Sequence, residues 1–114
     1  MPYLKIQTNL PHDDNTRQNF LKKASAAVAS ELGKPESYVM VAFDPVIPMM
    51  FAGKDAPCAF MELKSIGLPE SKTTALSKSL CNLIESELGI PSARSYIEFS
   101  DAPRAMWGWD RKTF

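Results

Sequence analysis

The sequence predicts a two-layer α/β (α+β) sandwich, in which duplicated β-α-β units form a four-stranded sheet with two helices on one face. An internal repeat is the first observation behind this prediction, because Glu-Leu-Gly at 31–33 recurs at 87–89, each time followed by a proline and then a tyrosine. Apolar stripes at helical spacing precede both copies, and strand-like segments flank each stripe. We therefore expect one domain over residues 1–114 with two related halves, 2–57 and 58–114.

The first half starts with a strand over residues 2–8, where apolar and polar side chains alternate. A helix follows, with Asp14 or Thr16 as its N-terminal cap and Gly33 in a left-handed conformation at its end. Residues 38–43 are continuously apolar, which is typical of a strand covered on both faces. The core-facing stripe of the helix consists of Phe20, Ala24, Val28 and Leu32.

The second half repeats this order, with an alternating strand over residues 58–66, a helix, and a strand over residues 95–100. Ser71 is the expected cap of this helix and Gly89 its end. Because crossovers between parallel strands are right-handed, both helices are expected on one face of the sheet, which leaves the other face bare. The core-facing stripe of this helix consists of Leu76, Leu80, Ile84 and Leu88.

Composition excludes several classes of function. The 13 basic and 13 acidic side chains give a net charge of zero, so no basic excess favours nucleic acid or an anionic membrane surface as a partner. The longest uncharged apolar stretch, residues 45–53, contains two prolines and is far shorter than the roughly 20 residues of a spanning helix. The start of the chain lacks the pattern of a secretory signal, so the cytoplasm is the expected compartment.

The sequence contains few residues that typically carry catalysis or bind a metal. Cys58 and Cys81 lie 23 residues apart and are expected to be reduced thiols in the core. His12, the single histidine, lies in a polar turn before the first helix, where we expect a surface side chain. No cluster of His, Cys and carboxylate residues has the spacing of a metal site, so no metal is expected.

The bare sheet face predicts self-association, because soluble proteins rarely leave a large apolar sheet surface in water. A closed cyclic assembly of three or more chains and a dimer of sheets would both cover it, and the sequence does not choose between them. The tail after Asp101 carries Trp107, Trp109 and Phe114 beyond all elements of the repeat. Aromatic residues of this size are expected to lie against a neighbour.

Pro2, directly after Met1 at the start of a strand, is the unusual feature of the chain. A small second residue allows removal of the initiator methionine, which leaves a secondary amine held by the strand. Burial in an apolar pocket and a nearby cation such as Lys34 both disfavour the protonated amine, so it can act as a base at neutral pH. The alternative is that Pro2 only begins an edge strand.

The order of motifs along the chain resembles the macrophage migration inhibitory factor family, within the tautomerase superfamily built on an N-terminal proline. The resemblance covers nearly the whole chain, and its specificity lies in the order of motifs that are common one by one. These motifs are Pro2, Thr8-Asn9 with Pro11, Gly33-Lys34-Pro35 with Tyr38, Pro48-Met49-Met50-Phe51 with Gly53, Pro57-Cys58-Ala59, Ser65-Ile66-Gly67, Tyr96-Ile97, Gly108-Trp109 and Thr113-Phe114.

The resemblance implies a homotrimer whose three sheets form a barrel inside the helices, with active sites between subunits. It also implies keto-enol tautomerisation of small aromatic acids, of the phenylpyruvate and dopachrome types, without a cofactor. Pro2 is then the catalytic base and acid, and Lys34 holds the substrate carboxylate. The other implied contacts are Ser65 with the backbone of Ile66, the aromatic walls Tyr38, Trp109 and Phe114, and Tyr96 of the adjacent subunit.

Several positions depart from the family pattern. Glu98 replaces an asparagine, and its carboxylate would either pair with the cation of the site or repel an anionic substrate. Trp107 replaces a smaller valine at the pocket rim, where it narrows access or adds a stacking surface. Met61 replaces the second cysteine of a CxxC pair, so thiol oxidoreductase activity is not expected. His12 and Val46 occupy positions tied to receptor engagement in the mammalian cytokine, so the sequence gives no support for a protein receptor.

Three functions remain open from the sequence. The first is the trimeric tautomerase, and the second is an interaction or signalling protein of the same fold with a vestigial pocket, which retention of Met1 would favour. The third is another proline-dependent reaction, such as hydration or decarboxylation of a small keto acid, which the carboxylate of Glu98 keeps open. The resemblance also makes secretion without a leader compatible with the missing signal.

Overall fold

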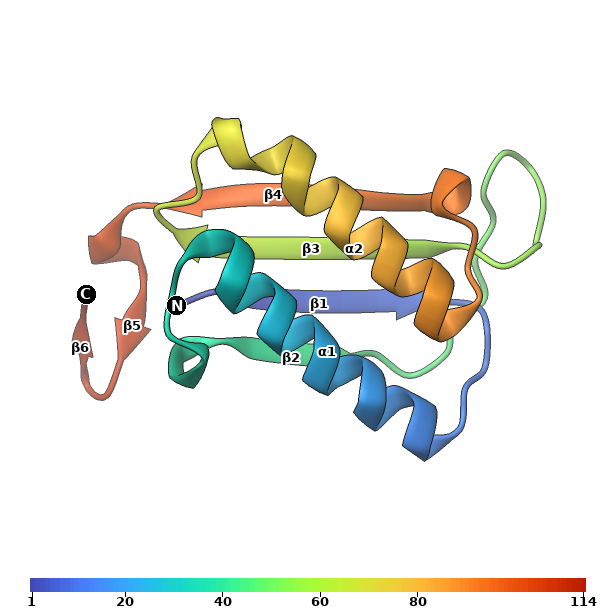
Figure 1. Cartoon of the computed structure of the whole chain (residues 1–114), viewed down its shortest axis with the longest axis horizontal. Helices are drawn as coiled ribbons and strands as arrows, with labels where there is room; N and C mark the ends of the chain where they lie inside the picture. The colour runs from blue at the N-terminus through green and yellow to red at the C-terminus, as the bar shows by residue number, and fades with distance from the viewer.

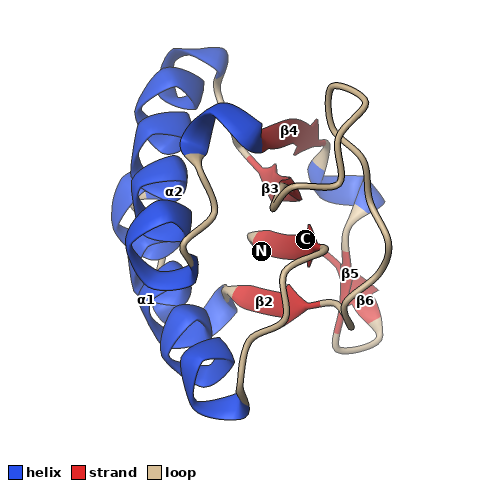
Figure 2. Ribbon diagram, turned by 90° about the vertical axis from the view of Figure 1, so that its right-hand side faces the viewer, coloured by secondary structure: helices blue, strands red, loops and turns tan.

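Two helices lie side by side across one face of a four-stranded sheet, which confirms the predicted layers (Figure 1, Figure 2). The computed structural model describes residues 1–114. Its strands are β1 (Tyr3–Thr8), β2 (Met40–Phe43), β3 (Ala59–Ile66) and β4 (Ser95–Ala102). Its helices are α1 (Asp14–Leu32) and α2 (Thr73–Leu88). Neither helix is both long and apolar enough to cross a membrane.

The sheet order β2-β1-β3-β4 places the two β-α-β units next to each other. β1 pairs with β2 and β3 pairs with β4 in parallel, as expected of strands joined by a helical crossover. The two units meet at the centre of the sheet, where β1 and β3 run antiparallel and Ile6 lies opposite Met61. The repeat in the sequence therefore corresponds to two equivalent halves of the fold.

The core fills the space between the helices and the sheet. Both predicted helical stripes are buried, and alternate residues of β1 and β3 meet them from the sheet. Leu4, Ile6, Met61 and Leu63 have no accessible surface. Burial of an apolar side chain of this size contributes about 1.5–3 kcal/mol, so these contacts fix the helices on this face of the sheet.

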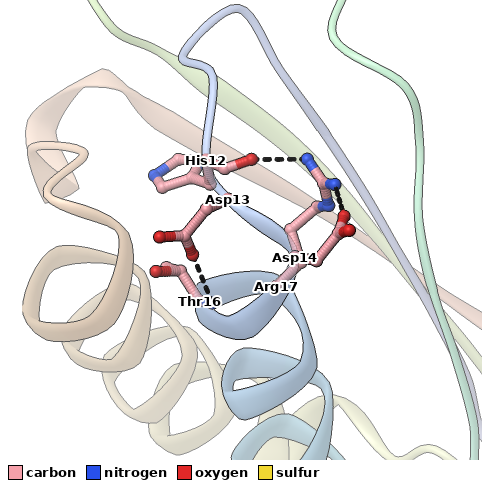
Figure 3. A network of polar contacts seen from close by, with 5 residues as sticks. All are labelled: His12, Asp13, Asp14, Thr16 and Arg17. Carbon is pink, nitrogen blue, oxygen red and sulfur yellow. Dashed lines mark hydrogen bonds and ion pairs between the residues drawn. The ribbon is translucent and has the colours of Figure 1, made fainter.

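The helix termini partly correct the predicted caps. Asp13, not Asp14 or Thr16, caps α1, because its carboxylate accepts the Thr16 backbone N–H at 2.7 Å (Figure 3). Hydrogen bonding from Thr16 lowers the pKa of the Asp13 carboxyl. Ser71 does not cap α2, since it lies in a 3₁₀ turn, Glu70–Lys72, that leads into the helix without a side-chain cap. The predicted glycine ends are confirmed, with φ of 63° at Gly33 and 69° at Gly89.

The strand predicted over residues 38–43 is shorter and less covered than expected. Tyr38 closes a 3₁₀ turn, Glu36–Tyr38, and the strand begins at Met40. None of the four residues of β2 is fully buried, and Met40 is 65% exposed. Covering on both faces was therefore a wrong expectation for a single chain.

The sheet face away from the helices is bare, as predicted, but its centre is charged and not apolar. The Nζ of Lys5 lies 3.5 Å from a carboxylate oxygen of Asp44 and 3.9 Å from one of Glu62. The Nζ of Lys64 lies 3.8 Å from the other carboxylate oxygen of Glu62. Half-exposed ion pairs of this kind each contribute little to stability, about 0–1 kcal/mol. They make the middle of this face polar, so the purely apolar contact surface expected from the sequence is not present.

The tail forms a hairpin that the sequence analysis did not predict. β5 (Gly108–Trp109) pairs antiparallel with β6 (Lys112–Thr113). Asp110 and Arg111 form the two-residue turn, with positive φ of 48° and 65°. The hairpin lies at the same end of the sheet as the N-terminus (Figure 1).

Candidate active site

The start of the chain is fixed at two points. The Pro2 carbonyl accepts the backbone N–H of Met40 at 2.9 Å, which continues the pairing of β1 with β2. The amino group of Met1 donates to the Tyr38 carbonyl at 2.9 Å. Pro2 itself is fully buried. Its ring nitrogen therefore has a defined place at the end of the central strand.

A cavity of about 500 Å³ surrounds this point. It lies between the start of β1, the 3₁₀ turn before β2, and the C-terminal hairpin. Such a volume is that of a site for a small molecule, and most of its lining is apolar with few polar groups. Its lining residues are Met1, Pro2, Tyr3, Ser37, Tyr38, Val39, Met40, Trp107, Gly108, Trp109 and Phe114.

Three of the predicted aromatic residues pack together as one wall of the cavity. Trp109 stacks on Phe114 with ring centroids 5.6 Å apart. Tyr38 meets both of them edge-on, at 6.0 Å from Trp109 and 6.2 Å from Phe114. Trp107 lines the same cavity and is half-buried. The predicted aromatic residues of the tail therefore all lie at this cavity.

A cation lies close to the N-terminus. Lys34 follows the glycine that ends α1. Its Nζ lies so close to Gly67 that a Cβ atom added to this glycine would be 3.5 Å from it. Burial, and secondarily the charge of Lys34, lower the pKa of the amino group at Met1. The site therefore favours a neutral amine at the start of the chain with a positive charge nearby, which is the combination that an amine base acting on an anionic substrate requires.

Ser65 and Ile66 are not part of the cavity wall. The Ser65 hydroxyl is fully buried and donates to the Ile66 carbonyl at 2.9 Å, so it is not free for a ligand. β3 places both residues at the same end of the sheet as Pro2, since Lys64 lies opposite Tyr3. The fold therefore brings neither residue to the cavity of its own chain.

Tyr96 and Glu98 lie away from the Pro2 cavity of their own chain. Both project from β4 on the open face, and both are exposed. Tyr96 is opposite Phe60, which is opposite Gln7 near the far end of β1. A single chain does not bring these two residues to Pro2.

His12 is not the surface side chain that the sequence analysis expected. Its Nε2 lies 2.7 Å from the Leu88 carbonyl at the end of α2, and its ring meets Phe43 edge-on at 6.1 Å. Its own carbonyl accepts a hydrogen bond from Arg17 (Figure 3). Nδ1 is buried without a partner. The residue therefore links the turn before α1 to the end of α2.

The two cysteines and the acidic residues form no reactive cluster. Cys58 is buried as predicted, whereas Cys81 is half-buried. No group of three or more His, Cys, Asp or Glu side chains is placed to hold a metal ion.

Arg94, which the sequence analysis did not single out, donates hydrogen bonds to four backbone carbonyls of the loop before β3. No local sequence pattern indicates such a role, because its partners lie about 40 residues away along the chain.

Known proteins resemble this chain over its whole length. A family model described as macrophage migration inhibitory factor (MIF) matches residues 1–114. A macrophage migration inhibitory factor homolog of Brugia malayi is 43% identical and covers 100% of this chain and 99% of its own. The macrophage migration inhibitory factor of Mus musculus is 35% identical, with the same coverage. The crystal structure of a homologue from Prochlorococcus marinus superposes with a TM-score of 0.93 at 41% identity, covering 98% of both chains.

Proposed function

The chain belongs to the macrophage migration inhibitory factor family, and we propose that it is a keto-enol tautomerase that works without a cofactor. The observation that carries this proposal is a cavity for a small molecule built around the first residues of the chain. The proposed base is the ring nitrogen of Pro2, which becomes the chain terminus when Met1 is removed. The proposed substrates are small aromatic keto and enol acids of the phenylpyruvate and dopachrome types.

The geometry around Pro2 supports its role as a base. Its carbonyl is held by Met40, so the ring cannot leave the cavity without breaking the pairing of β1 with β2. Burial and the charge of Lys34 act on an amine at this end of the chain in the same direction, toward the neutral form. Neutral Pro2 takes the proton from the enol hydroxyl, and the resulting prolinium returns it to the carbon at the other end of the enolate.

Lys34 and the aromatic wall orient the substrate in this proposal. The ammonium group pairs with the substrate carboxylate in a charge-assisted contact. Tyr38, Trp109 and Phe114 pack against its aryl ring, and Trp107 adds a second surface. Both ends of the substrate are then held, which places the reacting carbon next to the proline nitrogen.

We propose a homotrimer as the functional unit. Tyr96 and Glu98 are exposed on the open face, far from the cavity of their own chain, and in the trimer they would reach the cavity of a neighbouring subunit. The charged centre of the open face around Lys5 and Glu62 fits a hydrated interior better than a dry contact between stacked sheets. In the same assembly, the backbone at Ile66 would contact the ligand.

The test is the initial rate of phenylpyruvate tautomerisation by untagged protein whose mass shows that it begins at Pro2. The matched variant is Pro2→Gly, which still permits removal of Met1. We expect the variant to lose at least about 100-fold in kcat/KM, the usual share of a general base. Equal rates in two proteins of the same oligomeric state would contradict the proposal.

A second candidate function is binding or signalling without catalysis, and one observation favours it. With Met1 in place, its amino group is bound to the Tyr38 carbonyl and its side chain lines the cavity. A chain that keeps Met1 has an acylated nitrogen at Pro2, which is no base, and would use the cavity for binding or signalling only. The mass measurement in the same experiment separates the two functions.

A further inference from the structure

The loop between β2 and β3, residues 44–58, is here called the arm. It extends from the end of the sheet opposite the C-terminal hairpin (Figure 1). Asn9, just after β1, ties the middle and the C-terminal end of the arm to the sheet. Its amide nitrogen donates to the carbonyls of Met49, Asp55 and Ala56, and its amide oxygen accepts the N–H of Cys58. The arm is therefore a built structure with a defined conformation.

The tip of the arm is a tight turn at residues 51–54. Phe51 and Lys54 exchange two backbone hydrogen bonds, of 3.0 and 3.1 Å. Between them, Ala52 and Gly53 both have positive φ, 56° and 71°. The left-handed conformation costs a non-glycine residue about 1–2 kcal/mol, so contacts elsewhere must hold Ala52 in place.

Arg94, in the 3₁₀ turn before β4, supplies those contacts. Its guanidinium donates to the Phe51 carbonyl at 3.2 Å and to the Lys54 carbonyl at 3.2 Å, which holds the turn from both sides. Two further hydrogen bonds reach Pro57 at 2.9 Å and Ala56 at 3.0 Å. With four bonds in one plane, the orientation of the guanidinium is fixed.

The fixed guanidinium contacts the ring of Phe51, which in turn contacts the ring of Tyr96. Its central carbon lies 5.1 Å from the ring centroid of Phe51, within the range of a cation–π contact. Phe51 in turn packs on Tyr96, with centroids 4.9 Å apart and planes inclined by 55°. Without this neighbour, Tyr96 would stand alone on the open face, where it is 60% exposed.

We infer that Arg94 and Phe51 are positioning residues for Tyr96. The inference rests on the proposed function, in which Tyr96 enters the cavity of a neighbouring subunit. A side chain loses rotamer freedom when a ligand immobilises it, and this loss weakens binding. The contacts of Arg94 with Phe51 and of Phe51 with Tyr96 order the tyrosine before the substrate arrives, so they act on KM and leave the chemical step unchanged.

A double-mutant cycle tests this inference with phenylpyruvate as the substrate. Phe51→Leu keeps an apolar side chain but removes the ring, and we expect it to raise KM about three- to ten-fold with little change in kcat. In a Tyr96→Ala background, the same substitution should leave KM unchanged, because the residue through which it acts is gone. Additive effects of the two substitutions would overturn the inference, and so would a Tyr96→Ala variant with normal KM.

Arg94→Lys provides an independent arm of the test. It keeps the charge but loses the planar fork, so we expect a rise in KM that also disappears in the Tyr96→Ala background. Arg17→Lys, on α1 and in contact with no aromatic ring, is the matched control and should leave KM unchanged. If the Phe51→Leu protein fails to assemble, as judged by sedimentation, Phe51→Tyr replaces it in the test. This variant keeps the ring and should restore both assembly and KM. A Phe51→Tyr protein that assembles but has a raised KM would contradict the inference.

The outcomes also separate this inference from the proposed function. If the wild-type protein shows no turnover that depends on Pro2, the proposed function fails and the inference fails with it. If turnover depends on Pro2 but the cycle is additive, only the inference fails.

Discussion

Replacing Thr8 with valine tests how the junction between β1 and the arm is held. Thr8 ends β1, and its side chain has no accessible surface. Its hydroxyl donates to the Cys58 carbonyl at 2.7 Å and accepts the Leu10 N–H at 3.1 Å. Valine has nearly the same shape and removes both hydrogen bonds, so hydrogen bonding and apolar burial have opposite effects on stability at this site.

The expected loss follows from these contacts. A buried group left without its partner costs about 1–3 kcal/mol, and the half-buried Leu10 N–H lies at the lower end, which gives about 2–4 kcal/mol for the two groups together. The added methyl group returns about 0.8 kcal/mol. We therefore expect Thr8→Val to lower the free energy of unfolding by about 1–3 kcal/mol. Thr8→Ser keeps both hydrogen bonds and loses one methyl group, so we expect a loss of about 1 kcal/mol.

The measurement is urea-induced unfolding followed by tryptophan fluorescence, at one protomer concentration because assembly shifts the midpoint. Thr73→Val is the matched control, since its hydroxyl donates to the Glu70 carbonyl at an exposed position and its loss should cost no more than about 0.5 kcal/mol. A Thr8→Val protein as stable as the wild type would refute the reasoning, because apolar burial would then outweigh two buried hydrogen bonds.

Two further predictions concern pH and the turn before α1. The rate should fall as the pH drops through the pKa of the Pro2 amine, because the protonated form accepts no proton. Burial and the charge of Lys34 lower the pKa of the amino group of Met1, and we expect the same two effects on the Pro2 amine that replaces it. Lys34→Gln should therefore move the acid limb of the kcat/KM profile to higher pH, and an unmoved limb would count against the electrostatic role of Lys34. His12→Ala should lower the free energy of unfolding, measured in urea, by about 1–2 kcal/mol, because it removes the hydrogen bond to the Leu88 carbonyl. A loss smaller than that of Asp14→Ala would mean that this hydrogen bond contributes nothing to stability.

The helices and strands could be predicted because their burial pattern is local. The stripe from Phe20 to Leu32 repeats at helical spacing, and the alternation around Ile6 shows which side of β1 is covered. Which side chains face each other across two strands of the sheet does not follow from such a local pattern. Lys5 and Glu62 face each other only once β1 and β3 are in register, so the charge at the centre of the open face could not be derived from either strand.

Contacts between polar groups that lie far apart along the chain could not be predicted from the sequence either. Arg94 and His12 both bind backbone carbonyls far along the chain, and carbonyls carry no sequence signal. The hairpin turn at Asp110 lacks the glycine that normally marks two-residue turns, and the run of cap-forming residues before α1 offered several candidates of equal quality. Pro2 could be proposed as a candidate because its position directly after Met1 is itself a feature of the sequence, and the structure places it beside a cavity.

The cavity joins parts of the chain that are far apart in the sequence. Pro2 leads into β1, whereas Trp109 and Phe114 belong to the C-terminal hairpin and its end, and all three line the same cavity. The core does not depend on this hairpin, because none of its residues belongs to the buried cluster that holds the helices on the sheet. Damage to the hairpin would therefore leave the unfolding transition nearly unchanged and still remove part of the cavity lining, so ligand binding reports on a region that a stability measurement does not detect.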